Sequence, residues 1–319
     1  MSKNNFVLGI DTSNYTTSVA LYDVDNNKII HARKLLPVAE GGRGLRQSDA
    51  VFHHTSQLHD VMSQLYAKID FLPEIMAVGV SARPRDAENS YMPCFTVGMN
   101  TAYSIATVLG VPVYEFSHQA GHIAAAVYSS GHTELYSKEF IAFHVSGGTT
   151  EAVLVKPDKN NIFRAEIVGR TLDLHAGQGV DRVGVMLGLK FPCGAELENL
   201  AKQCDKKISV KVCVKDTDCC LSGIENICSK MLQNNTDKSE IALTCLMFIE
   251  KTLDTMCGNI LKKYGDLPVL FAGGVMSDSI IRNSLAKKYD CLFASAELSS
   301  DNACGTAVLT ARKIEILGR

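Results

Sequence analysis

Hydrophobic and polar residues alternate along the chain in two successive halves that have a similar order of elements. Short apolar runs and period-two alternation predict strands, and apolar residues three or four apart predict helices. The first half contains strands at 6–10, 18–23, 29–36, 77–80 and 113–116 and helices at 56–67, 95–109 and 118–128. The second half contains strands at 140–145, 151–155, 162–168 and 269–271 and helices at 179–187, 196–203, 222–232, 239–263, 278–288 and 303–315. This pattern predicts an α/β fold with two similar lobes and a central cleft.

The length and composition fit a two-domain enzyme. We place the N-terminal lobe at residues 1–116 and the C-terminal lobe at 117–302, with the final helix, 303–319, packing back on the N-terminal lobe. A chain of 319 residues can bury two cores, and 46% hydrophobic residues are ordinary for a globular enzyme. The net charge of −2 is not typical of a nucleic-acid-binding protein. An RNA substrate would therefore need a local basic patch or a partner protein.

The cysteines and the apolar runs favour a cytoplasmic protein. No apolar run reaches the ~18 residues of a membrane span, and the short polar start predicts no signal peptide. An odd number of cysteines, 11, indicates reduced thiols. Cys219 and Cys220 are interpreted as two small apolar residues in a turn, with a redox or metal role as the alternative. Helix 95–109, rich in small residues, fits either a buried core helix or a partner interface.

Three polar or glycine-rich turns follow predicted strands and are candidates for binding phosphate. Asp11 and Ser13 end the first strand, where a carboxylate and hydroxyls can hold Mg²⁺ or phosphate; an Asx turn is the alternative. The corresponding turn of the second half consists of Ser146, Gly147, Gly148 and Thr149. Glycine there allows positive φ and a close approach of backbone amides to phosphate, although a plain hairpin turn also fits. Gly273 and Gly274 lie between a strand and a helix, at an anion site or a tight turn.

Two histidines on one predicted helix are candidates for holding a metal ion. His118 and His122 lie one helical turn apart, so both imidazoles can reach a single ion, although ordinary histidines are the alternative. Asp301, just before the last helix, is the candidate third ligand or a helix cap. Two His and one carboxylate suit Fe²⁺, and also Zn²⁺ or Mn²⁺. The Glu of the H-E-x-x-H protease motif is absent. His54 and its neighbours are interpreted as surface or loop residues.

Together, these motifs resemble the TsaD family of tRNA N6-adenosine threonylcarbamoyltransferases, called Kae in archaea and eukaryotes and formerly O-sialoglycoprotein endopeptidase. The resemblance runs from Ile10 to Asn302. It implies a two-lobed actin/hexokinase/heat-shock-70-like ATPase fold. It also implies that His118, His122 and Asp301 are metal ligands and that Ser146–Thr149 is a phosphate turn.

The same resemblance implies a nucleotide site in the second half. Asp181 would bind the ribose hydroxyls, Gly194 and Glu198 would flank the sugar and base, and Gly273 and Gly274 would lie under the adenine. The chain departs from the family pattern in four places, which mark it as a divergent paralogue. They are Gln178 in place of the usual Glu, Asp278 in place of the usual Asn, and the arginine-containing segments 81–86 and 41–47.

The implied activity is the transfer of a threonylcarbamoyl group from threonylcarbamoyl-AMP to N6 of adenosine in tRNA. Implied cofactors are one divalent metal, Fe²⁺ first and Zn²⁺ second, acting as a Lewis acid, and an ATP- or AMP-type nucleotide with or without Mg²⁺. Implied partners are tRNA, a small ATPase and a homologous dimer partner, with no membrane. The sequence offers no evident general base. A non-catalytic nucleotide-binding scaffold and a small-molecule kinase remain alternatives. Candidate phosphate or tRNA contacts are Arg43, Arg46, Arg83 and Arg85.

Overall fold

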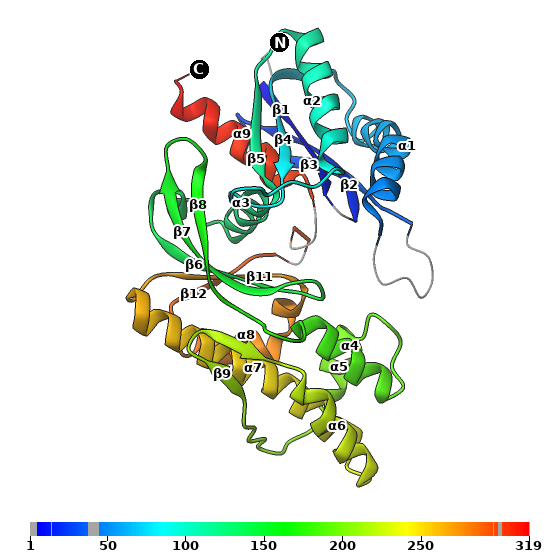
Figure 1. Cartoon of the computed structure of the whole chain (residues 1–319), viewed down its shortest axis with the longest axis vertical. Helices are drawn as coiled ribbons and strands as arrows, with labels where there is room; N and C mark the ends of the chain where they lie inside the picture. The colour runs from blue at the N-terminus through cyan, green and yellow to red at the C-terminus, as the bar shows by residue number, and fades with distance from the viewer. Residues whose placement is uncertain (1–4, 14, 38–44, 296, 299–301, 319) are drawn as a thin grey trace. The chain divides into compact units, whose positions relative to one another are not determined.

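The structure, a computed structural model, describes residues 5–13, 15–37, 45–295, 297–298 and 302–318. It divides into two compact units (Figure 1). The first unit consists of Met1–Ser137, Pro157–Arg164 and Leu298–Arg319, and the second consists of Lys138–Lys156 and Ala165–Glu297. Each unit has its own five-stranded sheet and its own hydrophobic core.

The sheet of the first unit has the strand order β3-β2-β1-β4-β5. Its strands are β1 (Asn5–Ser13), β2 (Thr16–Asp23), β3 (Lys28–Leu35), β4 (Glu74–Arg83) and β5 (Val113–Ser117). β1 lies at the centre, antiparallel to β2 and parallel to β4. A central strand that is buried on both faces needs apolar side chains at successive positions, which is why Phe6–Ile10 is a continuous apolar run.

Helices cover both faces of this sheet. Phe6, Leu8 and Ile10 share one core with residues of α1 (Gln47–Tyr66) and α2 (Phe95–Leu109). Val7, whose side chain points to the opposite face, shares a second core with α3 (His118–Ser130) and α9 (Cys304–Ile316). The period of two along β1 therefore separates two helical layers (Figure 1).

Close packing between α3 and α9 determines where the first unit ends. A Cβ on Gly305 would lie 1.8 Å from the carbonyl oxygen of Gly121, so the two helix backbones are in direct contact. The last helix thus packs on the strands of the first unit. Because α3 packs against it, residues 117–137 belong to the first unit, whereas the sequence placed the boundary after residue 116.

The second unit repeats the sheet topology of the first. Its strands are β6 (Phe140–Val145), β7 (Thr150–Asp158), β8 (Ile162–Arg170), β11 (Val269–Ala272) and β12 (Cys291–Phe293). Their order is β12-β11-β6-β7-β8, with β6 antiparallel to β7 and parallel to β11. Residues Phe143, Phe271 and Phe293 are in register on three neighbouring strands, and their rings stack. In both units a three-stranded meander is extended by two parallel strands on the side of its first strand.

Five helices and a short hairpin complete the second unit. They are α4 (Ala176–Met186), α5 (Gly194–Ala201), α6 (Gly223–Gln233), α7 (Lys238–Tyr264), α8 (Ser279–Ala286), β9 (Cys213–Lys215) and β10 (Asp218–Cys220). The long helix α7 contributes much of the core, through residues such as Cys245, Ile249 and Met256. Two 3-10 helices, η1 (Thr133–Ser137) and η2 (Gly274–Ser277), lie in the first and second unit respectively.

Most elements lie where the hydrophobic pattern predicts them, and the exceptions have identifiable causes. Helix α1 starts at Gln47, whereas the pattern predicts a start at residue 56, because His54 occupies a buried position that usually carries an apolar residue and so hides the first half of the stripe. Strands β9, β10 and β12 have three residues each, too few to show alternation. Cys220 accordingly lies in a strand and not in a turn.

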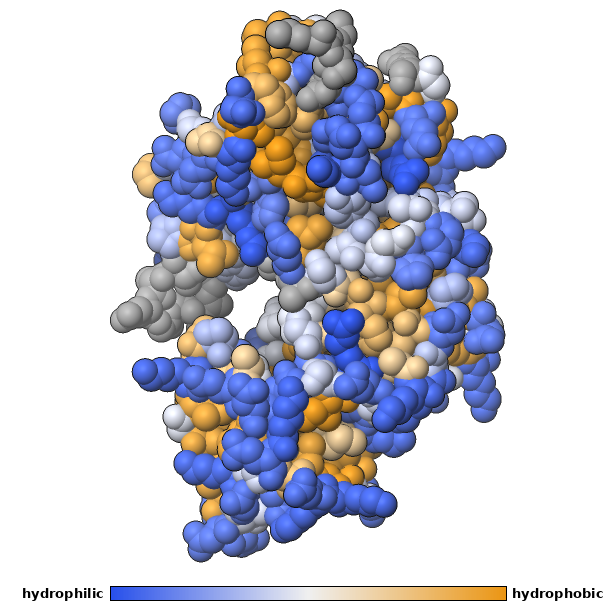
Figure 2. Space-filling model, turned by 180° about the vertical axis from the view of Figure 1, so that it is seen from behind, coloured by the Kyte–Doolittle hydropathy of each residue, from blue (hydrophilic) through white to orange (hydrophobic). Residues whose placement is uncertain are grey.

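The surface combines hydrophilic side chains with apolar ones (Figure 2). In the first unit, the exposed apolar residues include Leu72 in the loop before β4 and Tyr103, Val108 and Leu109 on α2. The opposite side of α2 is buried, so this helix serves the core and also presents apolar side chains to solvent. No helix in the described part of the chain has both the length and the apolarity that crossing a membrane requires.

The contact between α3 and α9 can be tested with Gly305→Ala. The added Cβ overlaps the Gly121 carbonyl, so the helices must separate. We expect the free energy of unfolding to fall by about 1–3 kcal/mol, as for other overpacked cores. Gly223→Ala at the start of α6 is the matched control, because its Cβ would lie 3.9 Å from Phe248, an ordinary contact. Equal stability of the two variants in chemical denaturation would contradict the packing argument.

Candidate functional site

The first candidate site is a pair of imidazoles on α3. His118 and His122 are one turn apart, and their Nε2 atoms are separated by 2.9 Å. The Nδ1 atom of His118 lies 2.8 Å from Oδ2 of Asp11, at the end of β1. An ionised carboxylate can only accept hydrogen bonds, so we assign the proton to Nδ1 of His118. Its Nε2 atom then presents a lone pair toward His122.

Asp11 is the buried centre of this site. Its side chain accepts hydrogen bonds from the Ser13 amide (2.9 Å) and the Ser81 hydroxyl (2.5 Å), and Ser81 lies 3.1 Å from Thr306 of α9. Burial raises the pKa of Asp11, but the charge and hydrogen bond of His118, together with these hydroxyl and amide contacts, hold the pKa below its ordinary value. The carboxylate is therefore ionised at neutral pH and orients the imidazole of His118.

The histidine pair fits a divalent metal in chemistry and in geometry. The 2.9 Å between the two Nε2 atoms is the length of a hydrogen bond. Two nitrogen ligands about 2.1 Å from one ion lie about 3.0 Å apart at a right angle and about 3.4 Å apart at a tetrahedral angle, so little movement would bring both rings to one ion. A carboxylate behind a ligating histidine is a common second-shell arrangement. Within the described ranges, no group of three metal-binding side chains is assembled. The predicted third ligand, Asp301, lies outside the described residues.

The residues that follow Asp301 are anchored in the first unit. Asn302 is buried and accepts the Cys304 amide at 2.9 Å, and the Ala303 amide donates to Ser18 on β2 at 2.8 Å. The first turn of α9 then meets α3 at Gly121, between the two candidate ligands in sequence. The start of α9 is thus fixed against the helix that carries His118 and His122.

His54 is a buried residue of the same unit that the sequence interpretation missed. The sequence predicts a surface or loop position, but the side chain is completely buried on α1, with Nδ1 2.8 Å from the Thr17 hydroxyl. Burial lowers its pKa to about 4, so it is neutral at physiological pH. Its spacing could have indicated this burial, because His54 lies four residues before Leu58 and so on the same face of the helix. His54 and Gln57 share Thr17 as a hydrogen-bond partner and tie α1 to β2.

The second candidate site surrounds the Ser146–Thr149 turn in the second unit. The Ser146 hydroxyl accepts the amides of Gly148 (3.3 Å) and Thr149 (3.1 Å). Neither Gly147 nor Gly148 adopts the positive φ that the sequence analysis considered. The turn contacts the first residues of α4, because the Gly177 amide donates to the Ser146 carbonyl at 3.1 Å. The predicted phosphate turn and the start of α4, the helix that carries Asp181, are therefore neighbours.

Six glycines near the second candidate site differ in how much space surrounds them. A Cβ on Gly177 would lie 2.6 Å from the Gly147 amide, and a Cβ on Gly273 would lie 2.3 Å from the Val145 carbonyl. Packing alone explains these two glycines, and Gly273 also has a φ of 101°. By contrast, a Cβ would have nothing within 4 Å at Gly147, Gly148, Gly194 and Gly274. Packing does not require glycine at these four positions, which the sequence assigns to nucleotide binding.

The predicted ribose and base residues lie on α4, on α5 and at the start of α8. Asp181 on α4 accepts the Cys193 amide at 2.8 Å, immediately before Gly194 begins α5. Glu198 accepts the Ser279 amide (3.0 Å) and hydroxyl (2.5 Å) and pairs with Lys202 at 2.6 Å. Asp278, the residue before Ser279, caps α8 through the Ile281 amide at 2.9 Å. Glu198 and Asp278 are thus brought together.

Asp173 organises the segment before α4, a role that the sequence analysis did not assign. Its Oδ1 accepts the amides of Leu174 (2.6 Å) and Leu221 (2.7 Å), and its Oδ2 accepts the Ser222 hydroxyl (2.6 Å). These bonds hold the pKa of Asp173 below its ordinary value although burial raises it. Gln178, the departure from the family pattern, accepts the His175 amide at 3.4 Å across the first turn of α4.

Of the candidate arginines, Arg83 is engaged in an ion pair. Its guanidinium lies 2.6 Å from Asp86, which also accepts the Ser117 hydroxyl. Arg46 precedes α1, and Arg85 lies in the loop that follows β4. Both are exposed. Arg43 lies outside the described residues. Arg46 and Arg85 therefore remain candidates for contacting phosphate, whereas Arg83 positions Asp86.

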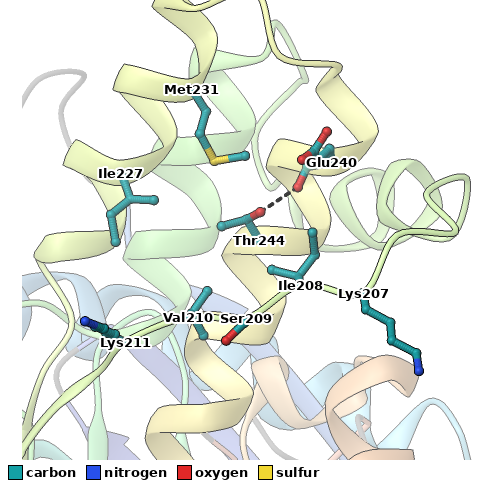
Figure 3. Close-up of a pocket in the computed structure, with 9 residues that line it drawn as sticks. All are labelled: Lys207, Ile208, Ser209, Val210, Lys211, Ile227, Met231, Glu240 and Thr244. Atoms are coloured by element: carbon teal, nitrogen blue, oxygen red, sulfur yellow. Dashed lines mark hydrogen bonds between the residues drawn. The ribbon is translucent and has the colours of Figure 1, made fainter.

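A pocket of about 380 Å³ lies elsewhere in the second unit (Figure 3). The extended segment 207–211 forms one side, and Ile227 and Met231 of α6 with Glu240 and Thr244 of α7 form the other. In Figure 3 the Thr244 hydroxyl points to the Glu240 backbone, to which it donates at 2.8 Å. The pocket is lined by none of the residues predicted for metal or nucleotide binding, so it is separate from both candidate sites.

Comparison with known proteins gives one consistent family. The family model named TsaD, tRNA N6-adenosine threonylcarbamoyltransferase, matches residues 32–308. The protein of this name from Buchnera aphidicola subsp. Schizaphis graminum is 27% identical, over 95% of this chain and 91% of its own. The Bacillus licheniformis protein is 28% identical, over 94% and 89%.

Solved structures confirm the predicted actin/hexokinase/heat-shock-70-like fold. The activator of 2-hydroxyisocaproyl-CoA dehydratase from Clostridium difficile, with bound ADPNP, is similar with a TM-score of 0.54 and 15% identity. It covers 98% of this chain and 97% of its own. HypF from T. kodakarensis is similar with a TM-score of 0.60 and 11% identity, over 99% of this chain and 48% of its own. At these identities the likeness establishes the fold alone.

The acidic pair of the second site predicts a pH dependence of stability. Burial, with the nearby charge of Glu198, raises the pKa of Asp278 from 3.8 to about 6. The folded state therefore holds this proton more tightly than the unfolded state, so stability falls as pH rises from about 4 to about 6. Asparagine is also a good helix cap. We expect the free energy of unfolding of Asp278→Asn not to show this fall. Between pH 4 and pH 7 it should therefore rise relative to that of the wild type by up to about 3 kcal/mol.

Denaturant titrations at several pH values would measure this difference. Asp237→Asn at the cap of α7 is the control, because that carboxylate is exposed and its pKa is lowered by its hydrogen bonds to Ser239. A constant difference between wild type and Asp278→Asn across this pH range would show that Asp278 is not a buried, strained carboxylate.

Proposed function

Because the chain belongs to the TsaD family of tRNA N6-adenosine threonylcarbamoyltransferases, we propose that it transfers a threonylcarbamoyl group from threonylcarbamoyl-AMP to N6 of a tRNA adenosine. The observation that carries this proposal is the pair of converging Nε2 atoms of His118 and His122, backed by the buried carboxylate of Asp11. A bound metal would give the two converging Nε2 atoms a chemical role beyond holding the helices in place.

In this proposal, His118, His122 and Asp301 hold one divalent metal, Fe²⁺ or Zn²⁺. When bound, the metal supplies a Lewis acid for the carbonyl of the carbamoyl group. Asp11 keeps His118 in the tautomer whose Nε2 can ligate, and Ser81 and Ser13 keep Asp11 ionised. The contact of α9 with Gly121 keeps the segment that begins with Asn302 close to both histidines.

The nucleotide part of the substrate is proposed to bind in the second unit. The open flanks of Gly147 and Gly148 let phosphate oxygens approach the backbone, beside the N-terminus of α4. The phosphate must then share the amides that the Ser146 hydroxyl now accepts. Asp181 would bind the ribose through Oδ2, since its Oδ1 accepts the Cys193 amide. Asp11 and Ser13, which the sequence predicts to hold phosphate or Mg²⁺, are both buried, and the oxygens of Asp11 are bonded to Ser13, Ser81 and His118.

The proposed reaction is an acyl transfer in which atoms balance without another reactant. The N6 atom of adenosine attacks the carbamoyl carbon, and the bond from that carbon to the AMP phosphate oxygen breaks. AMP leaves with the bonding electrons, and N6 loses one proton to solvent. Phosphate is a good leaving group, so the protein's main task is to orient the two substrates and stabilise negative charge on the carbonyl oxygen.

The proposed partners follow from the charge and from the exposed apolar residues. A chain with a net charge of −2 needs a local basic surface to hold tRNA, and exposed Lys207, Lys211 and Lys215 provide one in the second unit. The exposed apolar side chains of α2, Tyr103, Val108 and Leu109, suit a homologous dimer partner. We also propose that a small ATPase takes part, and that the reaction takes place in the cytoplasm.

Metal content is the first test of this proposal. We expect one Fe²⁺ or Zn²⁺ per chain in protein purified or reconstituted without oxygen. His122→Ala should abolish binding, and Asp11→Asn should weaken it about 10- to 100-fold, because it disturbs the tautomer of His118 without removing a ligand. His59→Ala is the control, since its side chain is 89% exposed. Wild-type protein without metal after reconstitution, or unchanged affinity in His122→Ala, would refute the metal site.

The open glycines provide a test of nucleotide binding. Gly147→Ala places its Cβ in open space, so we expect stability within about 0.5 kcal/mol of wild type or slightly higher. If phosphate approaches this backbone, the KM for threonylcarbamoyl-AMP in a tRNA transfer assay should rise about tenfold or more. Gly273→Ala should instead unfold at lower denaturant, because its Cβ meets the Val145 carbonyl. An unchanged KM in Gly147→Ala would place the phosphate elsewhere.

A further inference from the structure

The hairpin of β9 and β10 places two thiols opposite each other. Its strands are joined by a two-residue turn at Asp216 and Thr217, and Cys213 is the register partner of Cys220. Cys213 is exposed and Cys220 is half-buried. The turn is fixed, because Asn259 donates to the Asp216 carbonyl (2.6 Å) and Lys263 pairs with the Asp216 carboxylate (3.0 Å).

The geometry brings these thiols within reach of a covalent bond. Cβ atoms of directly opposite residues lie about 4.5–5.5 Å apart, and a disulfide needs about 3.5–4.5 Å. A small approach of the strands at their open end therefore suffices. Burial and a hydrogen bond with Cys213 raise the pKa of the Cys220 thiol, in keeping with the facing register of the two residues.

This hairpin also supports the segment that leads into α4. The Leu172 amide donates to the Cys219 carbonyl (2.8 Å), and the Arg170 amide donates to Asp218 (2.9 Å). Immediately after Cys220, the Leu221 amide donates to Asp173 at 2.7 Å. A change in the hairpin is therefore transmitted by direct hydrogen bonds to residues 170–174.

We propose that Cys213 and Cys220 form a reversible disulfide through exchange with a low-molecular-weight disulfide such as glutathione disulfide. The exposed Cys213 thiolate attacks one glutathione sulfur, and one glutathione thiolate leaves. The Cys220 thiolate then attacks the Cys213 sulfur and releases the second glutathione. Two protein thiols are oxidised and one glutathione disulfide is reduced to two thiols, so electrons and protons balance. The proposal concerns thiol chemistry and does not depend on the transferase activity.

The other cysteines that touch each other are less able to react. Cys228 and Cys245 are in contact but both are buried, and the hydrogen bond with Cys228 and burial raise the pKa of Cys245 well above its usual value. Cys257 is buried, and burial raises its pKa to about 12. Attack requires an accessible sulfur, and Cys213 is exposed, whereas Cys228, Cys245 and Cys257 are buried.

Mass spectrometry of the full chain in glutathione buffers tests this proposal. In excess glutathione disulfide, the chain should become two hydrogens lighter, and digestion should give a peptide that joins Cys213 to Cys220. Excess reduced glutathione should restore both thiols to alkylation. A joined peptide that involves other cysteines, or two thiols that stay alkylatable throughout, would overturn the proposal.

Three serine variants assign the roles of the two thiols. Cys220→Ser should stop at the first step and retain one glutathione on Cys213, whereas Cys213→Ser should form neither the adduct nor the bridge. Cys204→Ser, at a partly exposed cysteine outside the hairpin, should behave like wild type. A bridge to Cys213 that still forms in Cys220→Ser would show that another cysteine is the partner and would contradict the assignment.

Hydrogen exchange measures whether the disulfide stabilises residues 170–174, the segment that leads into α4. The disulfide should slow exchange of the Leu172 and Leu221 amides about tenfold, since closing a loop of this size restricts local opening. Amides of α2, in the other unit, should exchange at the same rate in both redox states. Unchanged exchange at Leu172 and Leu221 in the bridged protein would show that the hairpin does not stabilise this segment.

Discussion

The first unit depends on the burial of the Asp11 carboxylate. An ionised carboxylate withdrawn from water is costly unless its oxygens are hydrogen-bonded or paired with charge. Here the partners come from three elements: Ser13 from β1 itself, Ser81 from β4 and His118 from α3. The Ser81 hydroxyl also contacts Thr306, so α9 belongs to the same network. One charge thus fixes the sheet, the last helix and the orientation of the candidate metal ligand.

Close backbone contact between α3 and α9 places His118 within reach of Asp11. Asp11 can reach His118 only if α3 lies near the carboxyl end of β1, and the crossing of Gly121 and Gly305 brings α3 and α9 together there. Gly9 of β1 likewise faces Ala303, because a Cβ at Gly9 would lie 2.6 Å from the Ala303 carbonyl. Small residues therefore determine how closely α3, α9 and β1 approach one another, and the buried hydrogen bonds determine how the His118 side chain is oriented.

The sequence predicted the elements well because most of them have a clear hydrophobic period. The duplicated sheet order was also visible, since both halves begin with a three-stranded meander. A polar residue in a buried position was one source of error: His54 interrupts the apolar stripe in the first half of α1, and the predicted helix begins only at residue 56. The sequence identified the spacing of His118 and His122, but not Asp11 as the partner of His118. That pair joins residues 107 positions apart, and a local pattern carries no information about such a contact.

Two acidic residues, Glu198 on α5 and Asp278 at the start of α8, bear on how a nucleotide would lie in the second unit. Glu198 is neutralised by Lys202, but Asp278 is buried beside it and has a raised pKa. Such a pair repels phosphate and suits groups that donate hydrogen bonds, such as ribose hydroxyls or an exocyclic amine. The Ser146–Thr149 turn has amides and no acidic side chain, which suits phosphate. In the proposed function, the nucleotide therefore lies with its phosphate at this turn and its sugar and base toward Glu198 and Asp278, and the change from Asn to Asp at position 278 favours a donor at that end.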